Sequence, residues 1–296
     1  MLQSTNLPTS NFQTYLTDMK CALDLLDQYG RLQKMSSGSA EIDSLTDGIQ
    51  ESSFYLFYGS SDNHLILDSL LYRQLVGCIL PRSNKKNGFE SAAIFLNNVD
   101  FSIDKNKHQL LNPEKIAITA KYADIEPKIV SKNSFVQTAY NQEHQITIAE
   151  EIADEIESNP DIKLLAIRDL TRFVSRDKDA NWNTNDDANT LKKTLGTVYR
   201  ACSKNKVAIV VTGDCKLSNN GIIPKPIEGT YLKHLANIIV HIKPTYWSTT
   251  NGDVTSPYVS FKASMIKHPY QKTPKSVNFY ARRIGKRRNP ALFVLD

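Results

Sequence analysis

The sequence predicts an α/β fold built on a mostly parallel, twisted sheet with helices on both faces. Apolar runs without alternation are separated by helical segments, which is typical of parallel strands buried on both sides. The first of these runs, residues 54–58, ends at Gly59 and leads through a polar turn into an apolar helix. Two late segments, residues 259–263 and 277–281, alternate polar and apolar side chains, which predicts an antiparallel C-terminal extension.

The remaining elements follow from periodicity and from turn residues. Buried strands are expected at residues 54–58, 92–96, 164–167, 206–212 and 237–242, with a short strand near residues 129–130. Helices are expected at residues 11–34, 40–45, 65–72, 116–122 (continuing to about Pro127), 146–156 and 189–203.

The 296 residues suffice for one large domain and a small appendage. We expect residues 1–35 to form an N-terminal helical segment or linker, and residues 36–296 to form the core. No apolar run reaches the length of a membrane span, and residues 1–11 lack the features of a secretory signal. The four scattered cysteines favour a reducing setting, so we expect a cytoplasmic, nucleoid-associated protein, or a nuclear one if the source is eukaryotic.

Charge is distributed unevenly along the chain. Residues 254–295 contain nine Lys or Arg and no Asp or Glu, whereas the rest holds 27 basic and 31 acidic residues. A basic C-terminal segment on a mildly acidic body is typical of a partner that is a polyanion. A solvated surface run explains the same cluster equally well.

The strand, glycine and helix at residues 54–72 have the layout of a phosphate-binding loop, G-x-x-x-x-G-K-[ST]. Counting from Gly59 places His64 at the second glycine, Leu65 at the lysine and Ile66 at the hydroxyl residue. The lysine of such a loop neutralises phosphate charge, and its hydroxyl residue binds Mg²⁺. The strand, turn and helix of a phosphate-binding loop are therefore present, but the residues that neutralise phosphate charge and bind Mg²⁺ are not.

Three further stretches carry a resemblance to a known family. Residues 139–145, AYNQEHQ, resemble the A-[FY]-N-x-x-H-Q segment of the RecA/RadA recombinase family, in its archaeal and eukaryotic branch. Residues 36–49 resemble that family's approach to the core, and residues 225–236 resemble its K-P-I-G-G segment. With the buried strands in the expected order, the resemblance extends over about residues 19–280 and implies a RecA-like P-loop NTPase core.

The resemblance also identifies departures at the nucleotide site. The family's metal-supporting aspartate corresponds to Arg168, with Asp169 one residue later, and its water-activating glutamate corresponds to Val99. The polar sensor reads Gly213-Asp214. Four altered pieces imply a pseudo-ATPase, not an enzyme, with no cofactor and with ATP and Mg²⁺ binding not expected.

Two other uses of the altered site stay open. Arg168 and His64 could bind an anion, or Arg168 could form an internal salt bridge with Asp169 or Asp214, which we favour. No metal site is expected, because the histidines at positions 108, 144, 234 and 241 lack metal spacing with nearby carboxylates. His144 is expected to satisfy hydrogen bonds in the core.

The resemblance further implies contacts with DNA and with other subunits. Residues 176–185 and 214–229 match the family's two DNA-binding loops. The DNA-binding candidates are Arg176, Lys178, Trp182, Lys216, Lys225, Arg282, Arg283, Lys286, Arg287 and Arg288. Met19 and Ala22 stand where the family carries an aromatic-x-x-Ala motif that docks on a neighbouring core. Both could instead simply lie on the packing surface of their own helix.

The sequence thus predicts a RadA paralogue that assists DNA recombination and repair after losing ATP hydrolysis. Its expected partners are single- or double-stranded DNA and a RadA-type recombinase or another paralogue, with self-association possible and no membrane. Two other classes stay open: a divergent ATP-binding RecA-family ATPase, and a protein scaffold without DNA binding.

Overall fold

The computed structural model describes residues 30–60, 64–83, 87–100, 111–173, 184–215, 223–227, 229–245, 258–286 and 289–295. The chain divides into two compact units, residues 1–33 and 34–296. The second unit contains the sheet and the helices that pack on it. Most of the helix predicted at residues 11–34, including Met19 and Ala22, lies outside the described residues, and Lys34 itself belongs to a strand.

A nine-stranded sheet forms the centre of this unit, in the order β11-β10-β9-β8-β3-β7-β6-β4-β5. Strands β3 to β8 run parallel to one another, and β9 to β11 continue the sheet in antiparallel fashion. The strands are β3 (Phe54–Gly59), β4 (Ala92–Asn98), β5 (Ser134–Ala139), β6 (Ile162–Arg168), β7 (Ala208–Asp214), β8 (Ile238–Pro244), β9 (Tyr258–Lys267), β10 (Lys275–Lys286) and β11 (Asn289–Leu295). This arrangement confirms the predicted fold class.

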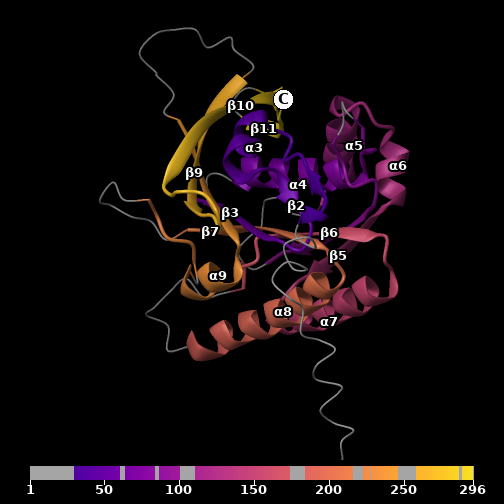
Figure 1. Cartoon of the computed structure of the whole chain (residues 1–296), viewed down its shortest axis with the longest axis vertical. Helices are drawn as coiled ribbons and strands as arrows, with labels where there is room; N and C mark the ends of the chain where they lie inside the picture. The colour runs from indigo at the N-terminus through magenta and orange to yellow at the C-terminus, as the bar shows by residue number, and fades with distance from the viewer. Residues whose placement is uncertain are drawn as a thin grey trace, which may run out of the picture. The chain divides into compact units, whose positions relative to one another are not determined.

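Two layers of helices cover the parallel strands (Figure 1). Helices α3 (Ala40–Thr46), α4 (His64–Ile79), α5 (Pro113–Tyr122) and α6 (Pro127–Lys132) share one hydrophobic core with the sheet. Helices α7 (Gln142–Ser158), α8 (Thr184–Lys204) and α9 (Gly229–Leu235) share the core on the opposite face. Neighbouring strand residues divide between these cores: Tyr55 and Phe57 face the first, and Leu56 and Tyr58 face the second. A short pair, β1 (Lys34–Met35) and β2 (Ile49–Gln50), adds Met35 to the first core.

Local sequence explains where several helices begin. Asn112 and Asn141 cap α5 and α7, each accepting a backbone N–H at 2.8 Å through its side-chain oxygen. Ser39 caps α3 in the same way, accepting the N–H of Ile42. Asp47 ends α3 in the left-handed conformation.

The sequence placed two elements wrongly. The helix predicted at residues 116–122 ends at Tyr122 and does not continue to Pro127, where α6 begins. Residues 129–130, predicted as a strand, lie in α6, because Pro127 fixes a helical φ at the first position of a helix. The strand follows at β5, an edge strand whose side chains are mostly exposed, so its residues give no buried-strand pattern. Helix α9 and strand β11 were not predicted.

The antiparallel extension folds against the first helix layer. Phe261 on β9 stacks on Phe279 on β10 with ring centroids 5.5 Å apart. On β11, Leu292 and Val294 are buried, and the Phe293 N–H donates to Ser69 Oγ on α4 at 3.1 Å. The extension therefore shares a core with α4 and does not hang from the domain as a free tail.

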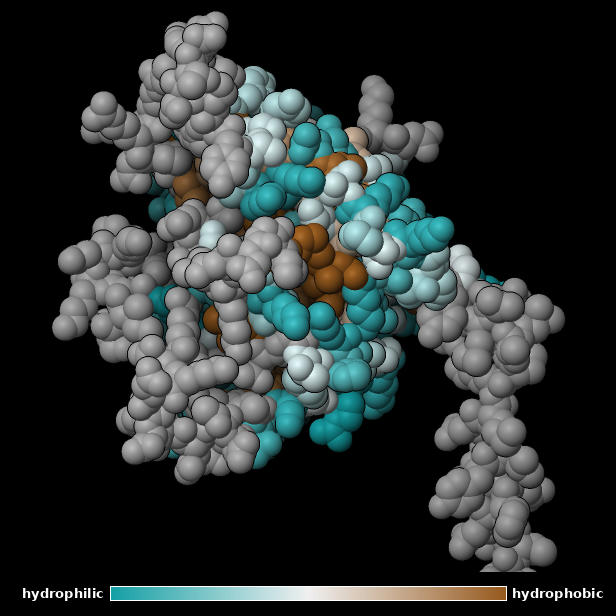
Figure 2. Space-filling view, turned by 90° about the vertical axis from the view of Figure 1, so that its left-hand side faces the viewer, coloured by the Kyte–Doolittle hydropathy of each residue, from teal (hydrophilic) through white to brown (hydrophobic). Residues whose placement is uncertain are grey.

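Hydrophilic side chains dominate the face seen in Figure 2, around a hydrophobic patch near its middle. Among the helices that the structure describes, none is long and apolar enough to cross a membrane.

Candidate functional site at the carboxyl ends of the parallel strands

Four parallel strands end side by side at one edge of the sheet. Gly59 at the end of β3 pairs with Asp214 at the end of β7, and Asn97 near the end of β4 pairs with Arg168 at the end of β6. In open α/β sheets, ligands bind at this carboxyl edge. The residues that the sequence assigned to a degenerate nucleotide site are thereby brought together, with α4 beginning at His64 beside them.

Arg168 is the centre of this edge. Its guanidinium donates from Nε to Asp68 Oδ1 at 2.7 Å and from Nη2 to Asp68 Oδ2 at 3.1 Å. A third hydrogen bond joins Nη1 to Asn97 Oδ1 at 3.2 Å. The Arg168 side chain is 8% exposed and that of Asp68 13%. This is a buried, two-pronged ion pair between β6 and α4.

Arg168 forms an internal salt bridge, as predicted. Its partner in the two hydrogen bonds above is Asp68, whereas the sequence analysis named Asp169 or Asp214. Burial alone would lower the pKa of Arg168, yet Asp68 opposes this effect so strongly that the pKa is raised above its ordinary value. On α5, Lys115 lies near both residues, and burial lowers its pKa despite Asp68.

Asp169 begins the segment after β6. Its φ of 45° is left-handed, a conformation that aspartate tolerates better than most residues. Its N–H donates to Thr212 Oγ1 at 3.0 Å, and Arg172 Nη1 lies 3.4 Å from its Oδ2. Asp169 and Arg172 are both buried, so a second internal ion pair lies next to the first.

His64 stands against Asp214, with Nε2 and Oδ1 3.8 Å apart. Burial lowers the pKa of His64, and Asp214, which would raise it, does not compensate. The imidazole is therefore neutral at pH 7, and its contact with Asp214 is a polar contact and not an ion pair. Asp214 itself is 2% exposed.

The other positions of the predicted site are apolar or are engaged in internal hydrogen bonds. Ile66 and Val99 are each 1% exposed, and Leu65 is partly buried. Asn98 Nδ2 donates to the Arg168 carbonyl at 2.9 Å, and its Oδ1 accepts from Gln145 Nε2 at 3.1 Å. Gln145, and not His144, thus supplies the buried hydrogen bonds, while the His144 ring stacks on Tyr140 with centroids 5.6 Å apart.

The predicted DNA-binding residues are only partly described. Lys225 and Arg282 are exposed, Arg283 is partly buried, and the Arg282 guanidinium lies 5.7 Å from the centroid of the Tyr122 ring. Lys286 ends β10. Arg176, Lys178, Trp182, Lys216, Arg287 and Arg288 lie outside the described residues.

A parallel sheet between two helix layers, with the altered edge just described, agrees with the resemblance noted from sequence. The family model described as Rad51 matches residues 29–250. The chain belongs to the Rad51 family. This finding confirms the RecA/RadA resemblance, and membership of the Rad51 family supports a RecA-like role in recombination and repair.

Individual relatives agree with the family model. The "DNA repair and recombination protein RadA" of Methanococcus voltae is 24% identical over 226 residues, covering 73% of this chain and 68% of the relative. The protein of the same name from Metallosphaera sedula is 23% identical over 228 residues, covering 76% of this chain and 66% of the relative. Identity at this level leaves room for large changes at individual sites of this Rad51-family chain.

Proposed function

We propose that this Rad51-family protein assists DNA recombination and repair by binding DNA, a recombinase, or both, without hydrolysing ATP. The buried pair of Arg168 and Asp68 carries the proposal. It stands at the position that the family resemblance assigns to the metal-supporting aspartate.

A guanidinium at that position opposes Mg²⁺ binding. A divalent cation is attracted by carboxylates and repelled by a fixed positive charge, and an arginine is not deprotonated in a protein. Asp68 is held in two hydrogen bonds by Arg168, so using it as a metal ligand would take a close counter-charge away from a buried guanidinium. Within the described residues, no group of three or more His, Cys, Asp or Glu is arranged to hold a metal.

The phosphate-binding helix start supports the same proposal. Leu65 and Ile66 offer neither the positive charge nor the oxygen ligand that Mg²⁺-nucleotide chemistry requires. Ile66 is 1% exposed and packs in the core, so it cannot be exchanged for a polar side chain without disturbing α4. These residues do not fit bound Mg²⁺-ATP, and no step through ATP is part of the proposed function.

DNA binding is supported by family membership and by the charge of the C-terminal segment. Arg282 and Lys275 project from β10 as exposed side chains, and no Asp or Glu occurs in residues 254–295. Exposed cations are suited to phosphate groups.

Two measurements test the proposal. Purified protein should release no phosphate from ATP and Mg²⁺ above the rate of a buffer blank, and titration calorimetry should detect no heat of ATP binding. A pull-down with the host's active recombinase, with and without single-stranded DNA, tests the accessory role. Hydrolysis that disappears when residues around Gly59 are changed would favour the divergent ATPase, and retention of neither DNA nor recombinase would favour a scaffold of another kind.

A further inference from the structure

The C-terminal strand β11 lies against α4, the helix that begins at the candidate site. β11 is the end strand of the sheet and pairs with β10. An end strand usually leaves one edge of its backbone open to solvent. Here the Phe293 N–H donates instead to Ser69 Oγ on α4 at 3.1 Å, and Figure 1 shows the yellow C-terminal end of the chain near α4. The strand therefore closes against the helix.

Both faces of β11 are covered as well. Neighbouring side chains of a strand point to opposite sides, so Leu292 and Val294 share one side, and Phe293 and Leu295 share the other. Leu292, Val294 and Leu295 are at most 5% exposed, and Phe293 is partly buried. The Phe293 ring packs edge-on against Phe261 of β9 with centroids 5.2 Å apart. β11 is therefore built into the core that it shares with α4.

The contact at Ser69 extends to the first turn of α4. Ser69 is 2% exposed, and its Oγ donates to the Leu65 carbonyl at 2.6 Å while it accepts the Phe293 N–H. Leu65 stands at the lysine position of the phosphate-binding loop pattern. One buried hydroxyl thus links β11 to the turn at which a phosphate-binding helix holds its ligand.

A second anchor holds the same part of α4 from another direction. Asp68 precedes Ser69, and successive side chains point about 100° apart around a helix. Arg168 on β6 holds Asp68 through two hydrogen bonds, whereas β11 holds Ser69. The helix is therefore fixed between the end of β6 and β11.

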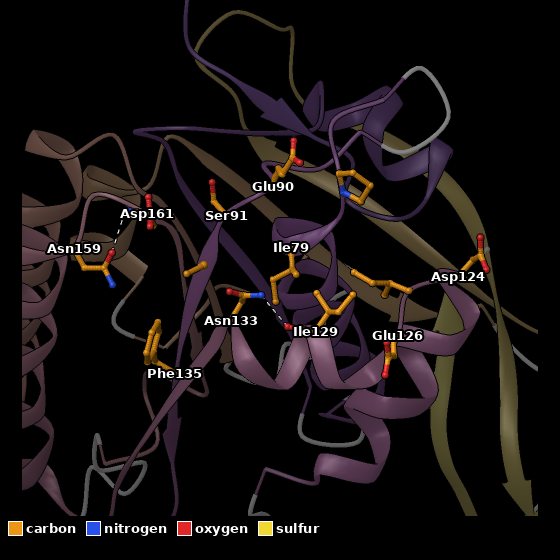
Figure 3. A pocket seen from close by; sticks show the side chains of 13 residues that line it. Ile79, Glu90, Ser91, Asp124, Glu126, Ile129, Asn133, Phe135, Asn159 and Asp161 are labelled. Atoms are coloured by element: carbon orange, nitrogen blue, oxygen red, sulfur yellow. Dashed lines mark hydrogen bonds between the residues drawn. The ribbon is translucent and has the colours of Figure 1, made fainter.

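The other end of α4 is less enclosed. Ile79, its last residue, lines a cavity of about 720 Å³, and Figure 3 shows it there with Ile129 of α6 and Phe135 of β5. Ile129 is 45% exposed and Phe135 41%. The two anchors thus act on the half of α4 that begins at the candidate site, and not on the half that ends at this cavity.

A bound nucleotide normally contributes to holding such a helix. Phosphate groups bind the N–H groups at its start, and a ligand that binds only the folded state stabilises that state. A protein that binds no nucleotide lacks this contribution. β11 lies outside residues 29–250, which the family model matches, so it comes from a part of the chain that the match does not cover.

We propose that β11 is a strap that holds the first half of α4 in place of a bound nucleotide and so keeps the candidate site in one conformation. This inference rests on the proposed absence of ATP binding. It assigns the C-terminal strand a role at the carboxyl edge of the sheet, through Ser69 and the apolar side chains of β11.

Hydrogen exchange of the full chain, followed by mass spectrometry, tests the strap. Ser69→Ala should raise the exchange rate of the amides of residues 65–73 about fivefold, because one buried hydrogen bond is lost. Leu292→Ala should raise it at least about 30-fold, because it leaves a cavity between β11 and the core. The amides of α7 and α8, on the opposite face of the sheet, should keep their rates. Circular dichroism establishes that each variant is folded.

Thr46→Val is the matched control. Thr46 is also 2% exposed, and its hydroxyl donates to the carbonyl four residues earlier, as that of Ser69 does, but it lies on α3. This variant should leave exchange in α4 unchanged. Unchanged exchange in α4 of both strap variants, or an equal increase in α4, α7 and α8, would overturn the proposal.

Repeating the measurement with ATP and Mg²⁺ separates the strap from the proposed function. We expect ATP to change exchange in α4 of neither the wild type nor Leu292→Ala. If ATP restored the protection of α4 in Leu292→Ala, the site would bind nucleotide and the proposed absence of ATP binding would be wrong, whereas the strap would be supported. If the strap variants left α4 unchanged and ATP had no effect, the strap would be wrong and the proposed function would stand.

Discussion

The guanidinium of Arg168 holds the carboxylate of Asp68 through two hydrogen bonds of 2.7 and 3.1 Å, joining the end of β6 to α4 across 100 residues of sequence. Both side chains are largely buried, so the loss of either one removes a close counter-charge from the other. A buried pair of this kind adds little net stability through charge attraction. Its main effect on the stability of the fold is that neither charge is left buried alone.

A double-mutant cycle measures this dependence. Arg168→Met and Asp68→Leu should each lower the free energy of unfolding by about 3–5 kcal/mol, because each leaves the partner charged and buried. The double variant should regain most of that loss, since two apolar side chains leave no charge behind. Urea unfolding of the four proteins gives the coupling energy.

The control cycle uses Lys204 and Glu157, which lie 3.4 Å apart with side chains 71% and 51% exposed. Lys204→Met and Glu157→Leu should show a coupling below about 1 kcal/mol, as exposed pairs do. Equal couplings in the two cycles would mean that the buried geometry does not decide the strength of the Arg168 pair.

A pH-dependent loss of stability is expected from His241. This residue is 4% exposed, its ring lies 5.0 Å from that of Tyr58, and burial, with help from Lys243, lowers its pKa to about 4. A lowered pKa favours the neutral form in the folded state, so stability is present above the unfolded pKa of about 6.5 and falls as pH drops below it. Between pH 7 and pH 5 the loss from this one group should be about 2 kcal/mol.

His241→Gln should remove that part of the pH dependence. Its unfolding free energy at pH 7 is expected to be lower than that of the wild type, and the difference between the two proteins should shrink at pH 5. Chemical unfolding at both pH values gives the comparison. If the difference in unfolding free energy between the two proteins is the same at pH 7 and pH 5, the pKa of His241 does not differ between the folded and unfolded states.

Strong local patterns in the sequence predicted most of the fold. Residues 54–58 are apolar or aromatic throughout, and residues 207–211 within the predicted strand 206–212 are apolar. The structure places residues 54–58 in β3 and residues 208–212 in β7, in the middle of the sheet. Strand β5 could not be predicted in the same way, because an edge strand with exposed Phe135 and Val136 has no buried pattern. Strand β11 was not predicted, because the segment that contains it was interpreted only for its charge.

The sequence predicted where the candidate site lies, but not which side chains form ion pairs in it. Arg168 was identified through the family resemblance, which assigns its position after an apolar run to a metal-supporting aspartate, whereas Asp68 was overlooked. Asp68 is the only Asp or Glu in α4, an otherwise largely apolar helix, and that isolation was the available signal of a buried partner. Sequence spacing cannot reveal which of the buried carboxylates a guanidinium will meet across 100 residues.

Docking on a recombinase-type core is expected to depend on Met19 and Ala22. The spacing of this pair from residue 36 resembles the position of the family's docking motif, and methionine fills aromatic pockets through its flexible side chain. Met19→Asp and Ala22→Glu should each weaken capture by the host's recombinase, because a carboxylate is costly to bury in an apolar pocket. Unchanged capture by both variants would limit this segment to packing within its own helix.

DNA binding, the last expectation, should depend on the basic C-terminal segment and should be strongly affected by salt. Phosphate contacts release counterions, so affinity for single strands should fall with a log–log slope of roughly −0.7 per contact. Replacing Arg283, Lys286, Arg287 and Arg288 with glutamine should weaken binding with little dependence on sequence and flatten the slope. Fluorescence anisotropy with a labelled oligonucleotide at several salt concentrations gives both quantities.

Two controls separate charge from stacking and from position. Trp182→Ala should weaken single-strand binding while leaving the slope nearly unchanged, because stacking on a base releases no counterion. Lys193→Gln/Lys204→Gln removes two exposed cations from α8, which already lie near Glu150 and Glu157, and should change neither affinity nor slope. Unchanged affinity and slope in the four-residue variant would mean that the basic segment serves a protein partner or solubility instead, because a segment that contacts phosphates cannot lose four cations without releasing fewer counterions.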